Sequence, residues 1–339
     1  MAIFLNILFL VLGMVLLIKG ADFFVSSASA IAKKMKVPSI FIGLTIVSIG
    51  TSLPELSVSI ASAISGSIDM SVSNIVGSNL FNMLFITGLV AVFSKIPMSQ
   101  TTKKIDFPFF NAITAVLLLF SLDKALNGAN SNLLSRTDSI LLIVLVILYL
   151  CILIFNANRD RKRKIRQEIY LNKTKDPNYI EPPQEKELKV WQIVLYFIFG
   201  LAAVVFGGEC VSSTAKFLAI KMGMSEALVG LTIVAFGTSL PELVTSVVAS
   251  RKGDNDLALG NVVGSNIMNI GVILGLVGTI RQVPVSSIIL TDLIILLVCT
   301  IIFTIFCCRK NDINKKEGTL FMCMYILYIA FAIVRNYCF

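Results

Sequence analysis

The sequence Gly50-Thr51-Ser52-Leu53-Pro54-Glu55 occurs a second time as Gly237-Thr238-Ser239-Leu240-Pro241-Glu242, and each copy lies near the middle of an apolar segment. Proline lacks the N–H group that a continuous helix needs, and the preceding glycine loosens the helix further. The carbonyls of Gly50 and Gly237 therefore lose their helical donors. A broken helix at membrane depth is tolerated where it lines a polar cavity, and its free carbonyls can coordinate a cation. The two hexapeptides predict two broken membrane helices at a cation site.

The rest of the chain has the composition of an all-α integral membrane protein. Of its 339 residues, 56% are hydrophobic and 14% charged, and the mean hydropathy is +0.87. Soluble domains carry about 25% charged residues. The apolar runs predict ten transmembrane helices. These cover residues 2–32, 37–66, 71–94, 106–122, 138–156, 190–220, 225–251, 256–280, 287–307 and 319–336.

The two halves of the chain are copies of each other. Between Gly43 and Ser59, 13 of 17 residues are identical to the residue 187 positions later. The same spacing relates the segments 43–82 and 230–269. We therefore predict a five-helix repeat in residues 1–155, a linker in 156–189 and a second five-helix repeat in 190–339. Because five is odd, the second repeat must enter the membrane inverted, an arrangement that recurs in transporters with a site at the midplane.

Basic residues predict the orientation. With the 156–189 linker placed in the cytoplasm, cytoplasmic loops hold 22 of the 29 Lys and Arg residues, and six lie outside. This is the positive-inside bias of a membrane protein. It also explains the net charge of +9 without a nucleic acid, because the basic residues lie between apolar runs. The sequence predicts a multi-pass protein of the cell membrane, with both termini outside.

The first motif offers a doubly anionic set of oxygen atoms. Glu55 and Glu242 each follow a helix break, and a carboxylate near the bilayer centre costs several kcal/mol unless it is paired. The mirrored segments contain no basic partner, so two such carboxylates would neutralise one divalent cation. Ca²⁺ prefers carboxylate, carbonyl and hydroxyl oxygens. Thr51, Ser52, Thr238 and Ser239 supply hydroxyl oxygens.

The second motif is Asn74-Ile75-Val76-Gly77-Ser78-Asn79 with Asn82, mirrored as Asn261-Val262-Val263-Gly264-Ser265-Asn266 with Asn269. Ser78 and Asn82 are four residues apart and therefore share one helix face. Each repeat would thus add a hydroxyl and an amide oxygen to the cavity. The alternative is that these small residues serve only close helix packing.

Other polar residues allow fewer conclusions. Histidine is absent, which excludes His-based catalysis and His metal ligands. We interpret the seven cysteines as small hydrophobic residues; they are Cys151, Cys210, Cys299, Cys307, Cys308, Cys323 and Cys338. Asp22 and Glu209 fit either an ion entry path or local capping. For Asp106 and Asp292, near helix starts, stabilisation by the helix dipole is the expected role.

The duplicated Gly-Thr-Ser-Leu-Pro-Glu-Leu and Gly-Ser-Asn-x-x-Asn motifs resemble the two alpha-repeats of the cation/calcium exchanger superfamily, in its sodium/calcium exchanger branch and in the small prokaryotic form. The resemblance implies antiport of Na⁺ and Ca²⁺ by alternating access, with no cofactor and no enzymatic activity. It places the ion ligands on Thr51, Ser52, Glu55, Ser78, Asn82, Thr238, Ser239, Glu242, Ser265 and Asn269, with main-chain carbonyl ligands on Ser48 and Ala235.

Three alternatives remain open at this point. A proton-coupled Ca²⁺ antiporter would use the same glutamates, although the Gly-Asn-Ala-x-Glu core typical of that branch is absent. A passive channel would share the ligands. A membrane-embedded enzyme is disfavoured by the missing histidine and by the absence of a Gly-x-Gly-Asp motif. The resemblance further implies independence of K⁺, because the potassium-dependent branch carries an aspartate at the position of Asn269.

Overall fold

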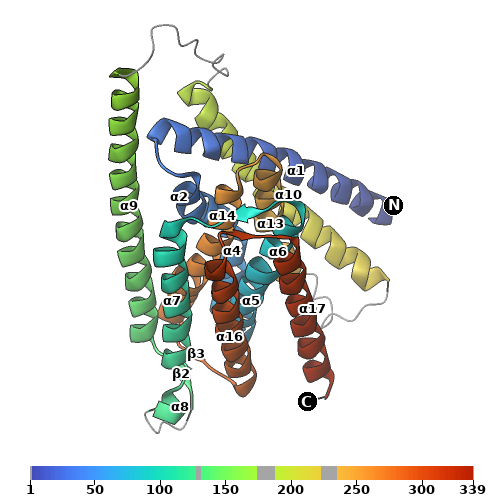
Figure 1. The fold of residues 1–339 in the computed structure, drawn as a ribbon. Helices are drawn as coiled ribbons and strands as arrows, with labels where there is room; N and C mark the ends of the chain where they lie inside the picture. Colours follow the sequence, from blue (N-terminus) through green and yellow to red (C-terminus); the bar gives the residue numbers. More distant parts are fainter. Residues whose placement is uncertain (1, 127–130, 174–187, 223–234, 339) are drawn as a thin grey trace.

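The computed structural model describes residues 2–126, 131–173, 188–222 and 235–338, and most of them are helical (Figure 1). Among these residues, seven helices are long and apolar enough to cross a membrane, and an eighth span results if one sharply bent pair is counted together. The protein is therefore a mostly helical, multi-pass membrane protein. Of the other two predicted spans, 106–122 contains a shorter helix, and part of 225–251 lies outside the described residues.

The first half of the chain contains one long helix followed by a series of shorter, interrupted ones. Its elements are α1 (Ala2–Met35), α2 (Ser39–Ile42), η1 (Gly43–Val47), α3 (Ser48–Thr51), α4 (Leu53–Ser65), α5 (Ile68–Leu80), η2 (Phe81–Ile86), α6 (Thr87–Phe93), β1 (Ile96–Pro97), η3 (Thr102–Asp106), α7 (Phe107–Phe120), α8 (Asp123–Leu126), β2 (Leu133–Leu134) and α9 (Arg136–Lys173). The η elements are π-helical turns within longer helices. Such turns are frequent at functional sites.

The second half repeats this order. Its described elements are α10 (Val190–Lys221), α12 (Ala235–Thr238), α13 (Leu240–Arg251), α14 (Asn255–Met268), η5 (Asn269–Ile273), α15 (Leu274–Ile280), β3 (Val283–Pro284), α16 (Ser287–Arg309), β4 (Asp312–Ile313) and α17 (Lys315–Cys338). The elements α4, α5, α6 and β1 each begin 187 residues before α13, α14, α15 and β3. The duplication seen in the sequence therefore extends to the positions at which the elements begin.

Helix α9 differs in length from the span predicted over residues 138–156. It continues to Lys173, so the first part of the predicted linker is helical. The extension is rich in Arg and Lys, which are good helix formers, and the helix satisfies its own backbone hydrogen bonds beyond the apolar run. The remaining linker residues 174–187 lie outside the described part of the chain.

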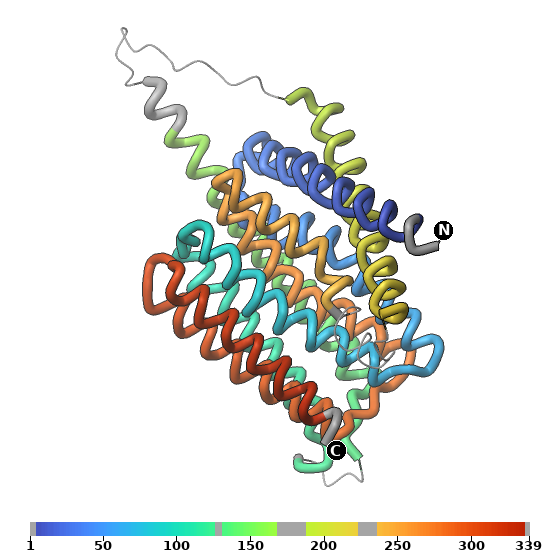
Figure 2. The backbone as a smooth tube through the Cα atoms, turned by 90° about the vertical axis from the view of Figure 1, so that its right-hand side faces the viewer, coloured from blue at the N-terminus to red at the C-terminus, as the bar shows by residue number. Residues whose placement is uncertain are grey.

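The two long helices α1 and α10 lie side by side across the stack formed by the other helices (Figures 1 and 2). They are antiparallel, because Gly13 approaches Gly207 while Gly20 approaches Val204 and Gly200. A Cβ atom on Gly207 would lie 2.8 Å from the carbonyl oxygen of Gly13. The missing side chains therefore allow the two backbones to touch, as small residues do in membrane helix pairs.

Two short antiparallel strand pairs connect the halves. β1 pairs with β4, and β2 pairs with β3. The two pairs lie at opposite ends of the upright helices in Figure 1. Each strand of the first half thus hydrogen-bonds to a strand of the second half, and the halves form one body.

Helix α14 packs against α2 and η1 at backbone contact, and this contact yields a stability prediction. A Cβ atom on Gly260 would lie 2.6 Å from the carbonyl oxygen of Ile40 and 3.0 Å from the Cα atom of Gly43. Backbone atoms cannot rotate away, so Gly260→Val must push the helices apart. We expect a loss of about 2–3 kcal/mol, seen as a fall of roughly 5–10 °C in the apparent melting temperature in detergent.

The matched control for this substitution is Ser73→Val. Ser73 occupies the position in α5 that corresponds to Gly260 in α14, and its side chain is exposed. The same valine should therefore leave the melting temperature nearly unchanged there. Equal melting temperatures for the two variants would contradict the close packing of α14.

Candidate cation site

Both predicted helix breaks are present in the structure. Helix α3 ends at Thr51, α4 begins at Leu53, and the two helical segments meet at an angle of 46°. The residue at the break, Ser52, has φ −83° and ψ 9°, and Ser239 has nearly the same values, φ −90° and ψ 9°. Each proline follows in the first turn of the next helix, where its missing N–H costs nothing.

The breaks place both glutamates in the interior. Glu55 and Glu242 are each 0% exposed. Oε1 of Glu242 accepts a hydrogen bond from the Ser52 hydroxyl at 2.9 Å, and Oε1 of Glu55 accepts one from the Ser239 hydroxyl, also at 2.9 Å. Each serine thus holds the carboxylate of the opposite half, so the two acidic groups face one shared centre.

The threonines of the first motif contact asparagines of the second motif. The Thr51 hydroxyl lies 3.0 Å from Oδ1 of Asn261, and the Thr238 hydroxyl lies 3.4 Å from Oδ1 of Asn74. These contacts again cross between the halves. Both asparagines belong to the second motif but are not among the predicted ligands, although their duplication was a signal for the site.

The second motif joins the two halves through asparagine pairs. The Asn79 amide nitrogen donates to the backbone carbonyl of Asn266, and the Asn266 amide donates back to the carbonyl of Asn79, both at 3.3 Å. The Asn269 amide donates to Oδ1 of Asn79 at 3.0 Å. These bonds hold α5 and α14 together beside the glutamates, and sequence reasoning missed the roles of Asn79 and Asn266.

The serines predicted as ligands on α5 and α14, and the asparagines predicted as ligands on the following turns η2 and η5, are all buried. Ser78, Asn82, Ser265 and Asn269 are each 0% exposed. The Ser265 hydroxyl lies 3.3 Å from Oε1 of Glu242. Of these four side chains, Ser265 is the one whose polar atom contacts a glutamate in the structure.

Five buried side-chain oxygen atoms of the predicted ligands accept no hydrogen bond from any described residue. They are Oε2 of Glu55, Oε2 of Glu242, Oγ of Ser78, Oδ1 of Asn82 and Oδ1 of Asn269. Buried polar atoms are normally paired, and an unpaired buried carboxylate oxygen is costly. Oxygen atoms of carboxylate, hydroxyl and amide type form the ligand set that hard cations prefer.

The backbone ligands predicted at Ser48 and Ala235 lie at the starts of α3 and α12. The Ser48 carbonyl already accepts the backbone N–H of Ser52 at 3.1 Å. The same oxygen also lies 3.4 Å from the Thr51 hydroxyl, so a cation bound to this carbonyl would replace the Thr51 contact at its second lone pair. Among the described residues, no cluster of three His, Cys, Asp or Glu side chains could hold a metal. A cation at this centre must therefore be held by the two glutamates together with neutral oxygen atoms.

The four other acidic residues considered from the sequence have their own partners. Asp22 forms a salt bridge with Lys252 at 2.7 Å, and the exposed Glu209 accepts the Ser213 hydroxyl. Asp106 accepts the hydroxyl group of Tyr149 at 2.9 Å.

Asp292 is bound by both guanidinium nitrogens of Arg335, at 2.8 and 3.0 Å. An ion pair between helices, and not the helix dipole alone, therefore stabilises Asp292.

These features define a multi-pass membrane protein with two buried carboxylates facing each other at the junction of two broken helices. The family model for the sodium/calcium exchanger protein matches residues 5–155 and 192–334. The chain belongs to this family, and it is a cation transporter of the exchanger class.

Relatives and solved structures agree with this assignment. The chain is 33% identical to the sodium/calcium exchanger MaX1 of Methanosarcina acetivorans, covering 98% of this chain and 99% of the relative. It is 34% identical to the putative antiporter CaxA of Alkalimonas amylolytica, covering 95% and 96%. Its fold matches the sodium-calcium exchanger NCX_Mj, in a structure of crystals soaked with 10 mM Na⁺, with a TM-score of 0.80, 28% identity and coverage of 97% and 99%.

Proposed function

We propose that this protein exchanges Na⁺ for Ca²⁺ by alternating access, with both ions competing for one site around Glu55 and Glu242. The observation that carries the proposal is the set of buried, unpartnered oxygen atoms around two carboxylates that have no basic partner among the described residues. The ligands would be Thr51, Ser52, Glu55, Ser78, Asn82, Thr238, Ser239, Glu242, Ser265 and Asn269, with the carbonyls of Ser48 and Ala235.

The crosswise hydrogen bonds suggest how competition would work. Two buried carboxylates that face each other repel, and one Ca²⁺ or several Na⁺ would remove that repulsion. A carboxylate loaded with one kind of ion is no longer available to the other kind. If only loaded sites cross between inward-open and outward-open states, uptake of one ion requires release of the other.

The proposed architecture is ten transmembrane helices in two inverted five-helix repeats, residues 1–155 and 190–339, joined by a cytoplasmic linker over 156–189. This architecture is supported by contacts that occur twice, once in each form, when 187 is added to one residue number and subtracted from the other. Ser52 with Glu242 corresponds to Ser239 with Glu55, and the pair Gly13 and Gly207 corresponds to Gly20 and Gly200. Such reciprocal contacts are expected when two copies are related by a two-fold axis in the membrane plane.

The test of the function is Na⁺-driven uptake of ⁴⁵Ca²⁺ into proteoliposomes. Vesicles loaded with Na⁺ and diluted into Na⁺-free medium should accumulate Ca²⁺, and vesicles without the Na⁺ gradient should not. Uptake driven equally well by a pH gradient would favour the proton-coupled alternative. Ca²⁺ flux that needs no opposing ion would indicate a channel.

The proposed orientation, in the cell membrane with both termini outside, predicts the result of cysteine labelling. In a background without native cysteines, Lys164→Cys on the α9 extension should react with an impermeant maleimide only from the cytoplasmic side. Ser67→Cys, at the turn between α4 and α5, should react only from outside. Both side chains are exposed. Labelling of both positions from one side would contradict the inverted repeat.

Independence of K⁺ follows from the neutral amide at position 269. Asn269 adds no charge to the two glutamates, so a fully bound Ca²⁺ leaves no negative charge for a co-transported K⁺. Replacing K⁺ with choline on the Ca²⁺ side should leave Na⁺-driven Ca²⁺ flux unchanged. A several-fold loss that added K⁺ restores would show that another acid supplies the missing charge, with Asp22 and Glu209 the first to examine.

A further inference from the structure

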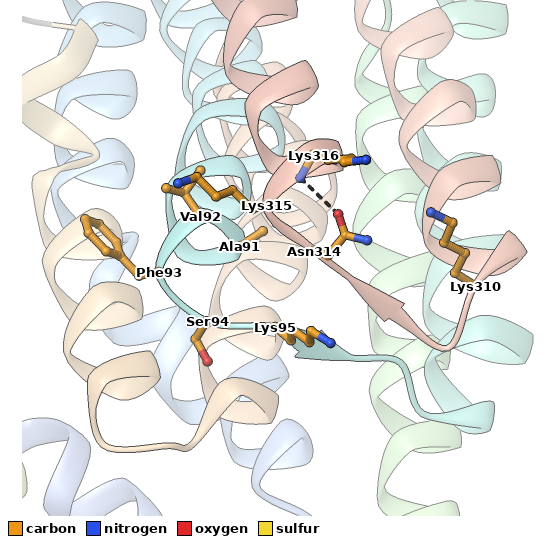
Figure 3. A pocket seen from close by; sticks show the side chains of 9 residues that line it. All are labelled: Ala91, Val92, Phe93, Ser94, Lys95, Lys310, Asn314, Lys315 and Lys316. Atoms are coloured by element: carbon orange, nitrogen blue, oxygen red, sulfur yellow. Dashed lines mark hydrogen bonds between the residues drawn. The ribbon is translucent and has the colours of Figure 1, made fainter.

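A cavity of about 510 Å³ lies between the end of α6 and the start of α17, beside the β1–β4 strand pair (Figure 3). Four lysines line it, and no acidic residue does: Lys95, Lys310, Lys315 and Lys316. In Figure 3, Lys95 lies on one side of the cavity, while Lys315 and Lys316 extend from the start of α17 on the other. Segments more than 200 residues apart in the sequence therefore contribute positive charge to one hollow.

Three of these four charges are unpaired. Lys310 forms a salt bridge with Glu317, whose other carboxylate oxygen accepts the backbone N–H of Asn314 at 3.1 Å. Lys95, Lys315 and Lys316 are exposed and have no acidic partner among the described residues. The cavity thus has a net positive charge that an anion can satisfy.

The cavity lies where the chain leaves the apolar part of the membrane. One apolar span ends at Phe93 and another begins at Lys315, and both residues line the cavity. The Phe93 side chain is 62% exposed at its rim. Lysines at this level lie near lipid phosphates, and an exposed aromatic ring beside them can contact acyl chains.

We propose that this cavity binds the phosphate headgroup of an anionic phospholipid, with Lys95, Lys315 and Lys316 holding the phosphate and Phe93 lying along the upper acyl chain. A volume of this size is that of an ordinary small-molecule site. The phosphate chemistry would also suit a free phosphate ester, but the position at the end of two membrane spans favours the lipid.

The opposite end of the molecule provides an internal comparison. A cavity of about 480 Å³ beside the β2–β3 pair has the corresponding construction, and the charged residues that line it in the described part of the chain are Arg136 and Arg281. The duplicated fold therefore creates a hollow at both ends, and among the described lining residues the lysines are gathered at the β1–β4 end. The repeated fold therefore accounts for the hollow at the β1–β4 end but does not by itself account for the lysines that line it.

The test is lipid binding to the full chain in detergent, measured by native mass spectrometry with phosphatidylglycerol and with phosphatidylcholine. The wild type should bind phosphatidylglycerol more tightly. The variant K95Q/K315Q/K316Q should lose about a hundredfold in that affinity, at about fivefold for each lysine. The matched control R161Q/K162Q/K164Q removes three exposed charges from the α9 extension and should keep the wild-type affinity.

Several results would overturn the proposal. They are equal binding of the two lipids, an equal loss in the control variant, and displacement of the lipid by soluble glycerol phosphate at comparable concentration, which would assign the site to a free anion. The variant K95R/K315R/K316R keeps the charge and should retain binding. If the triple glutamine variant does not elute as a folded protein, Lys95→Gln alone should still lose about fivefold. Because binding is measured directly, the outcome does not depend on the transport function.

Discussion

Glu55→Gln and Glu242→Gln are each expected to reduce Na⁺-driven Ca²⁺ uptake to background, a loss of at least about a hundredfold. Glutamine has nearly the same shape but removes half of the charge at the centre. Removing one partner of a buried charge pair costs about 3–5 kcal/mol. A divalent ion that meets one carboxylate instead of two loses binding free energy for the same reason. Both carboxylates are fully buried, so water cannot replace the missing charge. The measurement is initial ⁴⁵Ca²⁺ uptake into proteoliposomes of equal protein content.

Glu209→Gln is the matched control for these variants. Glu209 is an exposed carboxylate on α10 that accepts a hydrogen bond from Ser213 within its own helix. The same substitution there should leave uptake within about twofold of the wild type, as expected for a surface change. Size-exclusion profiles should show that all three variants are folded. Near-normal exchange in Glu55→Gln or Glu242→Gln would mean that the altered residue does not bind the transported ion.

A membrane potential is expected to shift the equilibrium Ca²⁺ distribution by about 50-fold per 100 mV. If three Na⁺ exchange for one Ca²⁺, each cycle moves one net charge, and one charge crossing 100 mV is worth about 2.3 kcal/mol. About 1.4 kcal/mol corresponds to a factor of ten in a concentration ratio. The ratio of Ca²⁺ concentrations across the membrane must therefore change by about 50-fold before net flux stops. When three Na⁺ enter for each Ca²⁺ that leaves, one net positive charge moves inward, so an inside-negative potential should favour the exit of Ca²⁺.

The potential can be set with valinomycin and K⁺ gradients, since K⁺ is not expected to be transported. Glu242→Gln vesicles under the same gradients measure leakage. A Ca²⁺ distribution that does not change with the membrane potential would indicate that two Na⁺ exchange for one Ca²⁺, because that exchange moves no net charge. The Ca²⁺ reversal point at several potentials therefore reports the stoichiometry directly.

The sequence alone was sufficient to predict the membrane class, the helix breaks and the inward-facing pair of glutamates. Each depends on a local property. Apolar runs between polar loops indicate membrane spans, and proline lacks an N–H wherever it stands, so Ser52 and Ser239 lie at breaks as expected. The duplication predicted the paired glutamates, because Glu55 and Glu242 occur at corresponding positions within two matching motifs. Both side chains are buried in the structure.

Only the tertiary structure decided which of these groups meet. The bonds from Ser52 to Glu242 and from Thr51 to Asn261 join residues that are 190 and 210 positions apart. The ion pair of Asp292 with Arg335 and the cavity between α6 and α17 depend in the same way on how helices lie beside one another. The sequence does not distinguish an apolar side chain that faces lipid from one that faces another helix, so it does not predict which helices are neighbours. The positions of the helices depend on backbone contacts at small residues such as Gly260 and Gly207, whose partners only the folded chain reveals.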